Sequence, residues 1–450
     1  MTEFERLHQT RDEAPGAGTL FAAICDMNGI LRGKRLPLAK LTKTQAEGIR
    51  MPLSSIGVDI WGVDVAGTRL TLEQGDQDGL CLPTGRAPVD LGWTGQGASL
   101  LPMWMRKEDG TPYFADARYL LADVLSRYQA KGLRPVVATE LEFFLLDPGE
   151  GSATPARGKT GNPPREFDNI YSLEELSEAS GFLDEVCAMA AAAGIEVEAA
   201  TSEGAPRQFE FNLLHRPDAL KIADDTLFFK QIIKNAARRH GALASFMAKP
   251  YEAHAGSGLH VHFSVIDEAG RNIFDDGTDR GSDLMLSAVA GLLDCMGELT
   301  LSCAPHLNSY RRLCPGGLAP TAIAWGYENR TSALRIPAGP HQARRVEHRV
   351  AGADANPYVV LATILGSALY GIEEKLTPPQ PVVSNAHALG LQSLAMDWRQ
   401  GLEWFAASPR VGRVLHPEFA AAFAACKQQE QDGFASRMTD FELLTYRLSV

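Results

Sequence analysis

One stretch near the middle of the chain combines a glycine-rich turn with a strand that carries two histidines. It runs His254-Ala255-Gly256-Ser257-Gly258-Leu259-His260-Val261-His262-Phe263-Ser264. Because side chains alternate between the faces of a strand, His260, His262 and Ser264 point one way and the apolar residues between them point the other way. A single histidine on a strand is more often a hydrogen-bonded structural residue. Two histidines behind Gly-Ser-Gly instead favour a sheet with one core face and one chemical face.

Glutamates alternate with apolar residues in the same manner elsewhere in the chain. Glu140 and Glu142 share one face of a predicted strand, and Glu210 follows Glu203 by seven residues in another alternating segment. Two carboxylates about 4 Å apart repel by roughly 4 kcal/mol at an effective dielectric constant near 20. Protonation, arginine partners or a divalent cation must compensate, and oxygen ligands mixed with histidine favour Mg²⁺ or Mn²⁺. A solvated polar face is the alternative, but three such strands favour a polar-lined funnel.

Arginines are concentrated late in the chain, with seven between positions 311 and 349. Planar guanidinium groups suit bidentate contacts with phosphate and carboxylate, although a solvated basic face would show the same composition. The chain has no GxxxxGK[ST] loop. A nucleoside triphosphate would therefore be held by arginines and metal ions instead of a phosphate-binding loop.

Charge and cysteine usage limit the class of protein. The net charge of −12 argues against nucleic acid or an anionic membrane as a partner. Seven cysteines are scattered without CxxC spacing, which is typical of a reducing compartment. Residues 1–6 lack a signal-peptide pattern, and the apolar run 359–372 is shorter than the ~18 residues that a membrane span needs. We therefore expect a soluble cytoplasmic protein.

Turn and capping signals divide the chain into a lead-in and two domains. Residues 1–17 are expected to be a flexible lead-in, and 18–110 a small, mostly β domain that begins with a hairpin around Asp26-Met27-Asn28-Gly29. Asp116 is predicted to cap the first helix of a larger domain spanning 111–450. Further helices are predicted at 41–50, 180–193, 218–240, 282–302 and 357–375, a strand at 135–146, and an exposed loop at 148–164.

Six ordered motifs resemble those of the glutamine synthetase superfamily, bacterial type I-like, from about residue 19 to the C-terminus. They are Glu140-Leu141-Glu142-Phe143-Phe144, Glu203 with Gln208-Phe209-Glu210, Gly256-Ser257-Gly258-Leu259-His260-Val261-His262, Asn308-Ser309-Tyr310-Arg311-Arg312-Leu313, Asn329-Arg330-Thr331 with Arg335, and Arg344-Arg345-Val346-Glu347-His348-Arg349. The resemblance implies an α+β fold: an N-terminal β-grasp domain followed by a catalytic domain whose antiparallel sheet lines a metal funnel. It also implies a homo-oligomer, a dodecamer of two hexamers with active sites between neighbouring subunits.

The resemblance also implies a role for each matching position. One Mg²⁺ or Mn²⁺ ion would be held by Glu142, Glu203 and Glu210, and a second by Glu140, His260 and Glu347, with two or three ions per site. Glutamate would be bound by Gly256, Arg312 and Arg349, and the transferred phosphoryl group would be stabilised by Arg330. The positions facing ATP would be Glu198, His262, Ser264, Arg335 and Arg345. The implied reaction is phosphorylation of the glutamate side chain by ATP to γ-glutamyl phosphate, followed by attack of an amine.

Two departures from the family pattern concern the amine. Glutamine synthetases have a glutamate in the flap sequence Pro-Gly-Tyr-Glu-Ala-Pro, where this chain has Leu318, and an aspartate before Ser-Ser-Ile, where it has Pro52. An uncompensated ammonium ion in a closed site costs several kcal/mol. We therefore expect a γ-glutamyl-amine ligase, similar to γ-glutamylpolyamine synthetase, with an amine pocket formed by Leu318, Pro52 and Leu53. A glutamine synthetase using ammonium and a non-catalytic relative are the alternatives.

Overall fold

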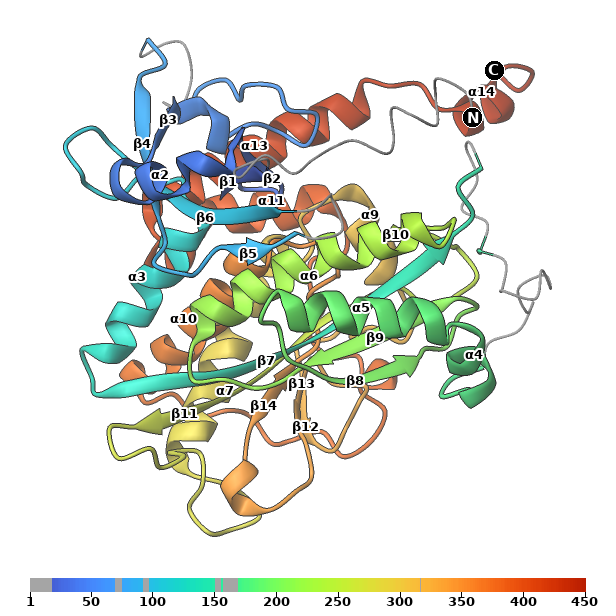
Figure 1. Cartoon of the computed structure of the whole chain (residues 1–450). Coiled ribbons are helices and arrows are strands. Elements are labelled where there is room, and N and C mark those ends of the chain that lie inside the picture. Colours follow the sequence, from blue (N-terminus) through green and yellow to red (C-terminus); the bar gives the residue numbers. More distant parts are fainter. Residues whose placement is uncertain (1–17, 69–74, 92–96, 150–154, 157–168, 316) are drawn as a thin grey trace.

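The computed structural model describes residues 18–68, 75–91, 97–149, 155–156, 169–315 and 317–450. Two separate β-sheets organise this part of the chain, one built from its first strands and one from the strands after residue 132. Figure 1 shows the first sheet at one end of the molecule, with the second crossing the middle. None of the helices in the described ranges combines the length and apolar character that a membrane-spanning helix needs. The predicted α+β class is confirmed.

The N-terminal sheet has six described strands in the order β2-β1-β6-β4-β3, with β5 paired to β6. Strands β1 and β6 are parallel, and the other pairs are antiparallel. The strands are β1 (Thr19–Cys25), β2 (Leu31–Pro37), β3 (Ile49–Pro52), β4 (Asp78–Pro83), β5 (Val89–Asp90) and β6 (Ala98–Arg106), and helix α2 (Leu41–Glu47) precedes β3. Short 3-10 turns occupy η1 (Leu38–Lys40) and η2 (Leu53–Ile56).

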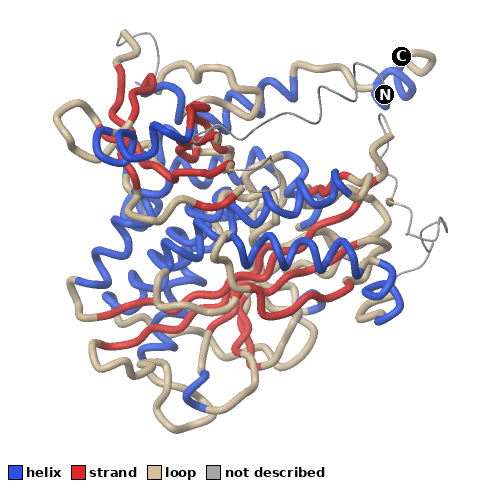
Figure 2. The backbone as a smooth tube through the Cα atoms, in the orientation of Figure 1, coloured by secondary structure: helices blue, strands red, loops and turns tan. Residues whose placement is uncertain are grey.

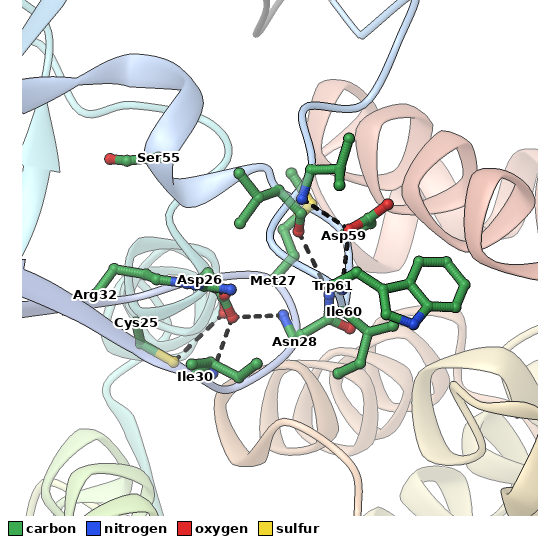
Figure 3. A network of polar contacts seen from close by, with 12 residues as sticks. Cys25, Asp26, Met27, Asn28, Ile30, Arg32, Ser55, Asp59, Ile60 and Trp61 are labelled. Carbon is green, nitrogen blue, oxygen red and sulfur yellow. Dashed lines mark hydrogen bonds and ion pairs between the residues drawn. The ribbon is translucent and has the colours of Figure 1, made fainter. Parts of the chain in front are cut away.

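Asp26 holds the predicted hairpin turn between β1 and β2. Its buried carboxylate accepts hydrogen bonds from the backbone N–H of Asn28 at 2.9 Å and of Ile30 at 2.8 Å, and from Nε of Arg32 at 2.9 Å (Figure 3). Gly29 adopts a φ of 77°, which favours glycine at the end of the turn. The hairpin is therefore fixed by a side chain as well as by the strand ladder.

A buried polar cluster joins this turn to the C-terminal helix α13 (Pro417–Ala435). Lys427 and Glu430 of α13 are fully buried and form an ion pair of 2.8 Å. Glu430 Oε1 also accepts a hydrogen bond from Asn28 Nδ2 at 2.9 Å and another from the backbone N–H of Ile60 at 2.9 Å. The first and last parts of the chain are thus held together by paired, buried charges.

The second sheet has eight described strands in the order β12-β13-β14-β11-β7-β9-β8, with β10 paired to β7. All pairs are antiparallel except β12 with β13. The strands are β7 (Leu133–Leu146), β8 (Val197–Ser202), β9 (Gln208–Leu213), β10 (Leu243–Ser245), β11 (Leu259–Asp267), β12 (Trp325–Tyr327), β13 (Leu334–Ile336) and β14 (Val346–His348). Figure 2 shows these strands crossing the molecule beneath several helices.

One face of this sheet is the core. Leu141 and Phe143 of β7, with Val261 and Phe263 of β11, are almost completely buried, as the alternation predicts. Helices α3 and α6 pack against β7, and α10 packs against both of them. The opposite face is therefore left for the polar side chains.

Some of the described helices from α3 onward match the predicted helices, and others were not predicted. They are α3 (Ala117–Gln129), α4 (Leu173–Glu178), α5 (Ser180–Ala192), α6 (Ala219–Arg239), α7 (Asp283–Met296), α8 (Thr300–Cys303), α9 (Leu307–Arg312), α10 (Pro357–Glu374), α11 (Trp398–Ala407), α12 (Pro409–Val414), α13 and α14 (Asp440–Tyr446). Two further 3-10 turns are η5 (His341–Ala343) and η6 (Ala386–Ala388). Asp116 caps α3 by accepting hydrogen bonds from two backbone N–H groups, as predicted.

Two predicted helices need correction. The helix expected at 41–50 ends at Glu47, because Gly48 has a φ of 72° and residue 49 begins β3. The helix expected at 282–302 is two helices, α7 and α8, with Gly297 directly after α7. The sequence patterns also gave no indication of α11, α12 and α13. The predicted lead-in 1–17 and most of the predicted loop 148–164 lie outside the described residues.

Candidate metal and nucleotide site

The two histidines of β11 meet a glutamate of β7 on the polar face. Glu140 lies opposite His260 in the strand register, and its Oε2 is 3.2 Å from His260 Nδ1. Its Oε1 is 2.8 Å from His262 Nε2. Burial acts to raise the pKa of Glu140, but the hydrogen bonds with His260 and His262 outweigh it and hold the pKa well below the ordinary range. Glu140 is therefore the anionic centre of this half of the site.

Glu347 of β14 extends the polar face on the other side of β11. It lies opposite His262 where β14 pairs with β11, and opposite Arg335 where β14 pairs with β13. Its Oε2 accepts a hydrogen bond from Arg335 Nη1 at 2.6 Å, and its Oε1 accepts one from Arg349. Burial alone would raise the pKa of Glu347, but the charge of Arg349 and those of the histidines lower it to about 2. Glu347 is thus a buried carboxylate kept ionised by cations.

Three further glutamates form an acidic group beside Glu140. Glu142 of β7 pairs in register with Glu210 of β9. Burial and the charges of Glu142 and Glu140 raise the pKa of Glu203 to about 8, whereas the nearby charge of Arg330 acts to lower it. Burial and the charges of Glu140, Glu142 and Glu203 raise the pKa of Glu210 to about 9. Carboxylates this close favour a proton or a divalent cation between them.

Among the residues that the structure describes, two groups of three side chains bring their ligand atoms within 4.8 Å of one another, and both contain Glu140. One group adds Glu210 and His260, and the other adds His262 and Glu347. Their mixed carboxylate and imidazole donors fit Mg²⁺ or Mn²⁺. The predicted grouping differs in two respects: His262, expected to face ATP, lies within a ligand group, and Glu210 lies with Glu140 and His260.

The glycine-rich turn before β11 brings a buried arginine against the site. A Cβ on Gly256 would lie 2.2 Å from the backbone oxygen of Ala248 and 2.9 Å from Arg312 Cγ, so only glycine fits. Arg312 is buried and donates hydrogen bonds to the backbone oxygens of Val350, at 2.8 Å, and Arg349, at 3.3 Å. The three residues predicted to bind glutamate, Gly256, Arg312 and Arg349, thus lie close together.

A large cavity opens beside the histidines. Its volume is about 1010 Å³, enough for a nucleotide. Its lining includes Glu140 and four of the residues predicted to face ATP, which are Glu198, His262, Ser264 and Arg345. Arg345 Nε is 3.3 Å from His262 Nδ1, which links the cavity to the ligand groups. The fifth predicted residue, Arg335, instead contacts Glu347.

The residues predicted to form the amine pocket come from distant parts of the sequence. Leu318 is 72% exposed in the segment before β12, whereas Pro52 and Leu53 belong to β3 and η2 of the N-terminal sheet. Figure 1 shows β3 at the opposite end of the molecule from β11 and β14 of the candidate site. An amine pocket containing all three residues stays a prediction.

Two polar residues of β9 support the acidic group and were not assigned a role from sequence. Gln208 Nε2 donates hydrogen bonds to Glu142 Oε2 at 3.4 Å and to the backbone oxygen of Gly256 at 3.0 Å. Asn212 Nδ2 donates to Glu210 Oε1 at 3.2 Å. Their alternation with Phe209 and Phe211 was the available signal, because it places them on the same face as Glu210.

Comparisons with known proteins agree with this geometry. The family model described as glutamine synthetase, catalytic domain, matches residues 114–446. The γ-glutamylputrescine synthetase PuuA of Escherichia coli (strain K12) is 36% identical over 425 residues, covering 93% of this chain and 89% of the relative. A glutamate–isopropylamine ligase of Pseudomonas sp is 33% identical, with 95% and 94% covered. The γ-glutamylethanolamide synthetase GlnA4 of Streptomyces coelicolor is 32% identical, with 94% and 91% covered.

Solved structures extend the likeness to the whole fold. A structure described as a GmaS/ADP complex superposes with a TM-score of 0.84 at 28% sequence identity and covers 99% of this chain and 100% of that chain. GmaS without ligand gives the same TM-score and covers 96% and 97%. Both sheets and the helices around them therefore have counterparts in one known architecture.

Proposed function

The chain belongs to the glutamine synthetase family, and from this premise we propose that it is an ATP-dependent ligase that joins glutamate to an organic amine as a γ-glutamyl amide. The observation that carries the proposal is the juxtaposition of Glu140, His260, His262 and Glu347 with a nucleotide-sized cavity. Acidic and imidazole ligands beside such a cavity suit phosphoryl transfer.

The reaction has two steps. An oxygen of the glutamate side-chain carboxylate attacks the γ-phosphorus of ATP, the bond to the β-phosphate oxygen breaks, and ADP leaves. The amine nitrogen then attacks the carbonyl carbon of γ-glutamyl phosphate, phosphate leaves, and the nitrogen gives up a proton. A bound Mg²⁺ or Mn²⁺ would neutralise phosphate charge.

The chain's own residues supply positioning and positive charge. We assign Arg330 to the transferred phosphoryl group, because its charge acts on Glu203 at the edge of the acidic group. Arg345 lies at the nucleotide cavity, and Arg312 and Arg349 lie beside the glycine turn, where a carboxylate-bearing substrate would be held. Fixed cations of this kind stabilise charge that develops during transfer.

Three apolar residues support an organic amine as the second substrate. Leu318 and Pro52 stand where glutamine synthetases carry acidic residues, and Leu53 follows Pro52. Without these carboxylates an ammonium ion has no anionic partner, whereas an alkyl group gains from apolar contact. The named relatives act with putrescine, isopropylamine and ethanolamine. A monoamine fits this apolar set better than a diamine with a second charged end.

Assembly and location follow from the family resemblance and form part of the proposal. We assign the chain to a dodecamer of two hexamers in the cytoplasm, in which Pro52 and Leu53 of one subunit approach Leu318 of its neighbour. The exposed apolar residues of α14 and the residues after it, Phe441, Leu444 and Leu448 among them, suit contact with another subunit. Analytical ultracentrifugation measures the oligomer directly.

An amine screen tests the proposal. Purified protein is incubated with glutamate, ATP and Mn²⁺ together with isopropylamine, ethanolamine, putrescine or ammonium, and phosphate release is measured. We expect an organic amine to give the highest kcat/KM. Equal activity with ammonium and with the best organic amine would contradict the proposal and favour glutamine synthetase.

A further inference from the structure

A second cavity lies behind the strands that carry part of the candidate site. Its volume is about 640 Å³, within the range of small-molecule pockets. Its walls come from β12, the end of β13, residues 337–339, Arg344, the segment before α7 and the extended segment 377–381. Its lining shares no residue with that of the nucleotide cavity.

At two places in the chain, adjacent residues face different cavities. In β13, Arg335 bonds Glu347 on the site face, and the adjacent Ile336 lines the second cavity. Before β14, Arg345 lines the nucleotide cavity, and the adjacent Arg344 lines the second one. The two cavities are therefore joined through adjacent residues of the same backbone segments.

Arg344 provides a buried positive charge in the second cavity. It is 7% exposed, and no carboxylate of the described residues lies within ion-pair distance. Its Nη2 donates to the backbone oxygen of Thr278 at 3.2 Å and approaches His341 Nδ1 at 3.4 Å, while its buried Nε has no partner. Buried guanidinium groups are normally paired with anions. Asp279 and Glu328 also line this cavity, but both are exposed.

Aromatic rings also line this cavity. Trp325 and Tyr327 have ring centroids 5.3 Å apart. Trp325 Nε1 donates to the backbone oxygen of Pro379 at 2.8 Å, and the Tyr327 hydroxyl donates to that of Arg280 at 2.8 Å. Because both polar atoms are already bonded to the cavity wall, the rings offer apolar surface to a ligand.

The same wall is bonded to the segment that carries Arg330. Asn329 Nδ2 donates to the backbone oxygens of Val382 and Ser384, each at 2.9 Å. The backbone N–H of Val382 in turn donates to the oxygen of Trp325 at 2.8 Å. A ligand against residues 377–381 would therefore bias the position of Arg330 indirectly, through the adjoining Val382 and its hydrogen bond with Asn329, the residue before Arg330.

We propose that this cavity is a regulatory site for a small organic carboxylate with an aromatic or other apolar body. The carboxylate pairs with Arg344, and the body packs on Trp325, Tyr327 and the prolines of 377–381. A bound ligand shifts Ile336 and Arg344. Because Arg335 and Arg345 are their neighbours in the chain, the shift also moves these two residues of the site.

A fluorine NMR titration with 4-fluorophenylacetate tests the site without using ligase activity. We expect saturable binding to the full-length protein, weakened about tenfold or more by Arg344→Gln, which removes the buried cation. Ala338→Trp fills the exposed rim, keeps Arg344 and should weaken binding to a similar extent. Arg399→Gln, a matched change at an exposed arginine of α11, should leave the affinity unchanged. The neutral analogue 4-fluorophenylacetamide should bind more weakly than the acid.

Hydrogen exchange gives the second readout. Peptides covering 328–348 should exchange more slowly with 4-fluorophenylacetate in the wild-type protein, but not in the Ala338→Trp variant. The absence of saturable binding, or binding unaffected by both variants, would overturn the site. Equal binding of inorganic phosphate would overturn the apolar-carboxylate class, and unchanged exchange at saturation would overturn the coupling. A protein that fails the amine screen can still pass these tests, so the two proposals fail separately.

Discussion

Glu140 of β7 lies directly opposite His260 of β11, with Oε2 of the glutamate 3.2 Å from Nδ1 of the histidine. The second oxygen of Glu140 is 2.8 Å from His262 Nε2. Both groups of close ligand atoms therefore share one carboxylate. Any ion held at either group depends on Glu140.

Glu140→Gln should weaken Mn²⁺ binding by about 100-fold or more, because the neutral amide removes the charge that both ligand groups share. Calorimetric titration of the purified variant with Mn²⁺ measures the effect. Glu403→Gln, which neutralises an exposed glutamate of α11, is the control and should bind as the wild type does. Unchanged Mn²⁺ affinity in Glu140→Gln would show that the ions lie elsewhere.

The acidic group predicts how stability depends on pH. The pKa values of Glu203 and Glu210 are raised to about 8 and about 9, first by burial and then by neighbouring carboxylates. From about pH 5 to 9 these two glutamates thus bind more protons in the folded, metal-free protein than in the unfolded chain, and their contribution to stability falls as pH rises. Mn²⁺ takes the place of these protons, so its stabilising effect should grow over the same range. The Tm of metal-free and Mn²⁺-saturated protein measures both trends. A constant Tm difference would contradict them.

Restoring the two missing carboxylates should change the preferred amine. The double variant Leu318→Glu, Pro52→Asp should raise kcat/KM for ammonium relative to the best organic amine by about tenfold or more, because a cation gains anionic partners and the alkyl group loses apolar surface. Leu318→Gln with Pro52→Asn is a matched control with similar side-chain size and no charge. A ratio that moves equally in both double variants would mean that charge is not the cause.

Gly256→Ala should impair glutamate binding, because the added Cβ meets the backbone oxygen of Ala248 at 2.2 Å and displaces the turn from Arg312. We expect KM for glutamate to rise about tenfold or more, with a smaller effect on KM for ATP. Gly297→Ala is the control, since its new Cβ would have no neighbour closer than 3.6 Å. Equal KM values for Gly256→Ala and wild type would remove this turn from the glutamate site.

Lys427→Met should destabilise the protein by about 3–5 kcal/mol, because it leaves Glu430 buried without its cation. The loss should appear in chemical denaturation as a lower free energy of unfolding. Lys43→Met, at an exposed lysine of α2, should change stability little. A loss in Lys427→Met no greater than in this control would show that the cluster does not hold the N-terminal sheet to α13.

Local sequence patterns were enough to predict several elements of the fold. Strict alternation in 254–264 predicted the polar and core faces of β11, and capping chemistry predicted the start of α3 at Asp116. Helix α13 is rich in alanine and gives no clear apolar stripe, so it was missed. Helix α11 was missed although Trp398, Leu402 and Phe405 are buried at helical spacing, because only ten residues carry the pattern. The break between α7 and α8, at residues 297–299, lies within a continuous apolar pattern that conceals it.

The site could be predicted only in part, because it depends on strands that pair across long stretches of sequence. His262 was expected to face ATP and lines the nucleotide cavity, and the register of β11 against β14 also places it opposite Glu347, 85 positions later in the chain. No local pattern encodes that register. The second cavity depends in the same way on β12, β13 and residues 377–381 meeting in space.

The most direct test follows oxygen from glutamate to phosphate. Glutamate labelled with ¹⁸O in its side-chain carboxylate is incubated with the protein, ATP, Mn²⁺ and the best amine from the screen, and the products are analysed by mass spectrometry. Formation of γ-glutamyl phosphate predicts one labelled oxygen in each phosphate released and one γ-glutamyl amide for each ADP. Phosphate without label, or ADP formed without an amide, would contradict the assignment of the chain as a glutamate–amine ligase.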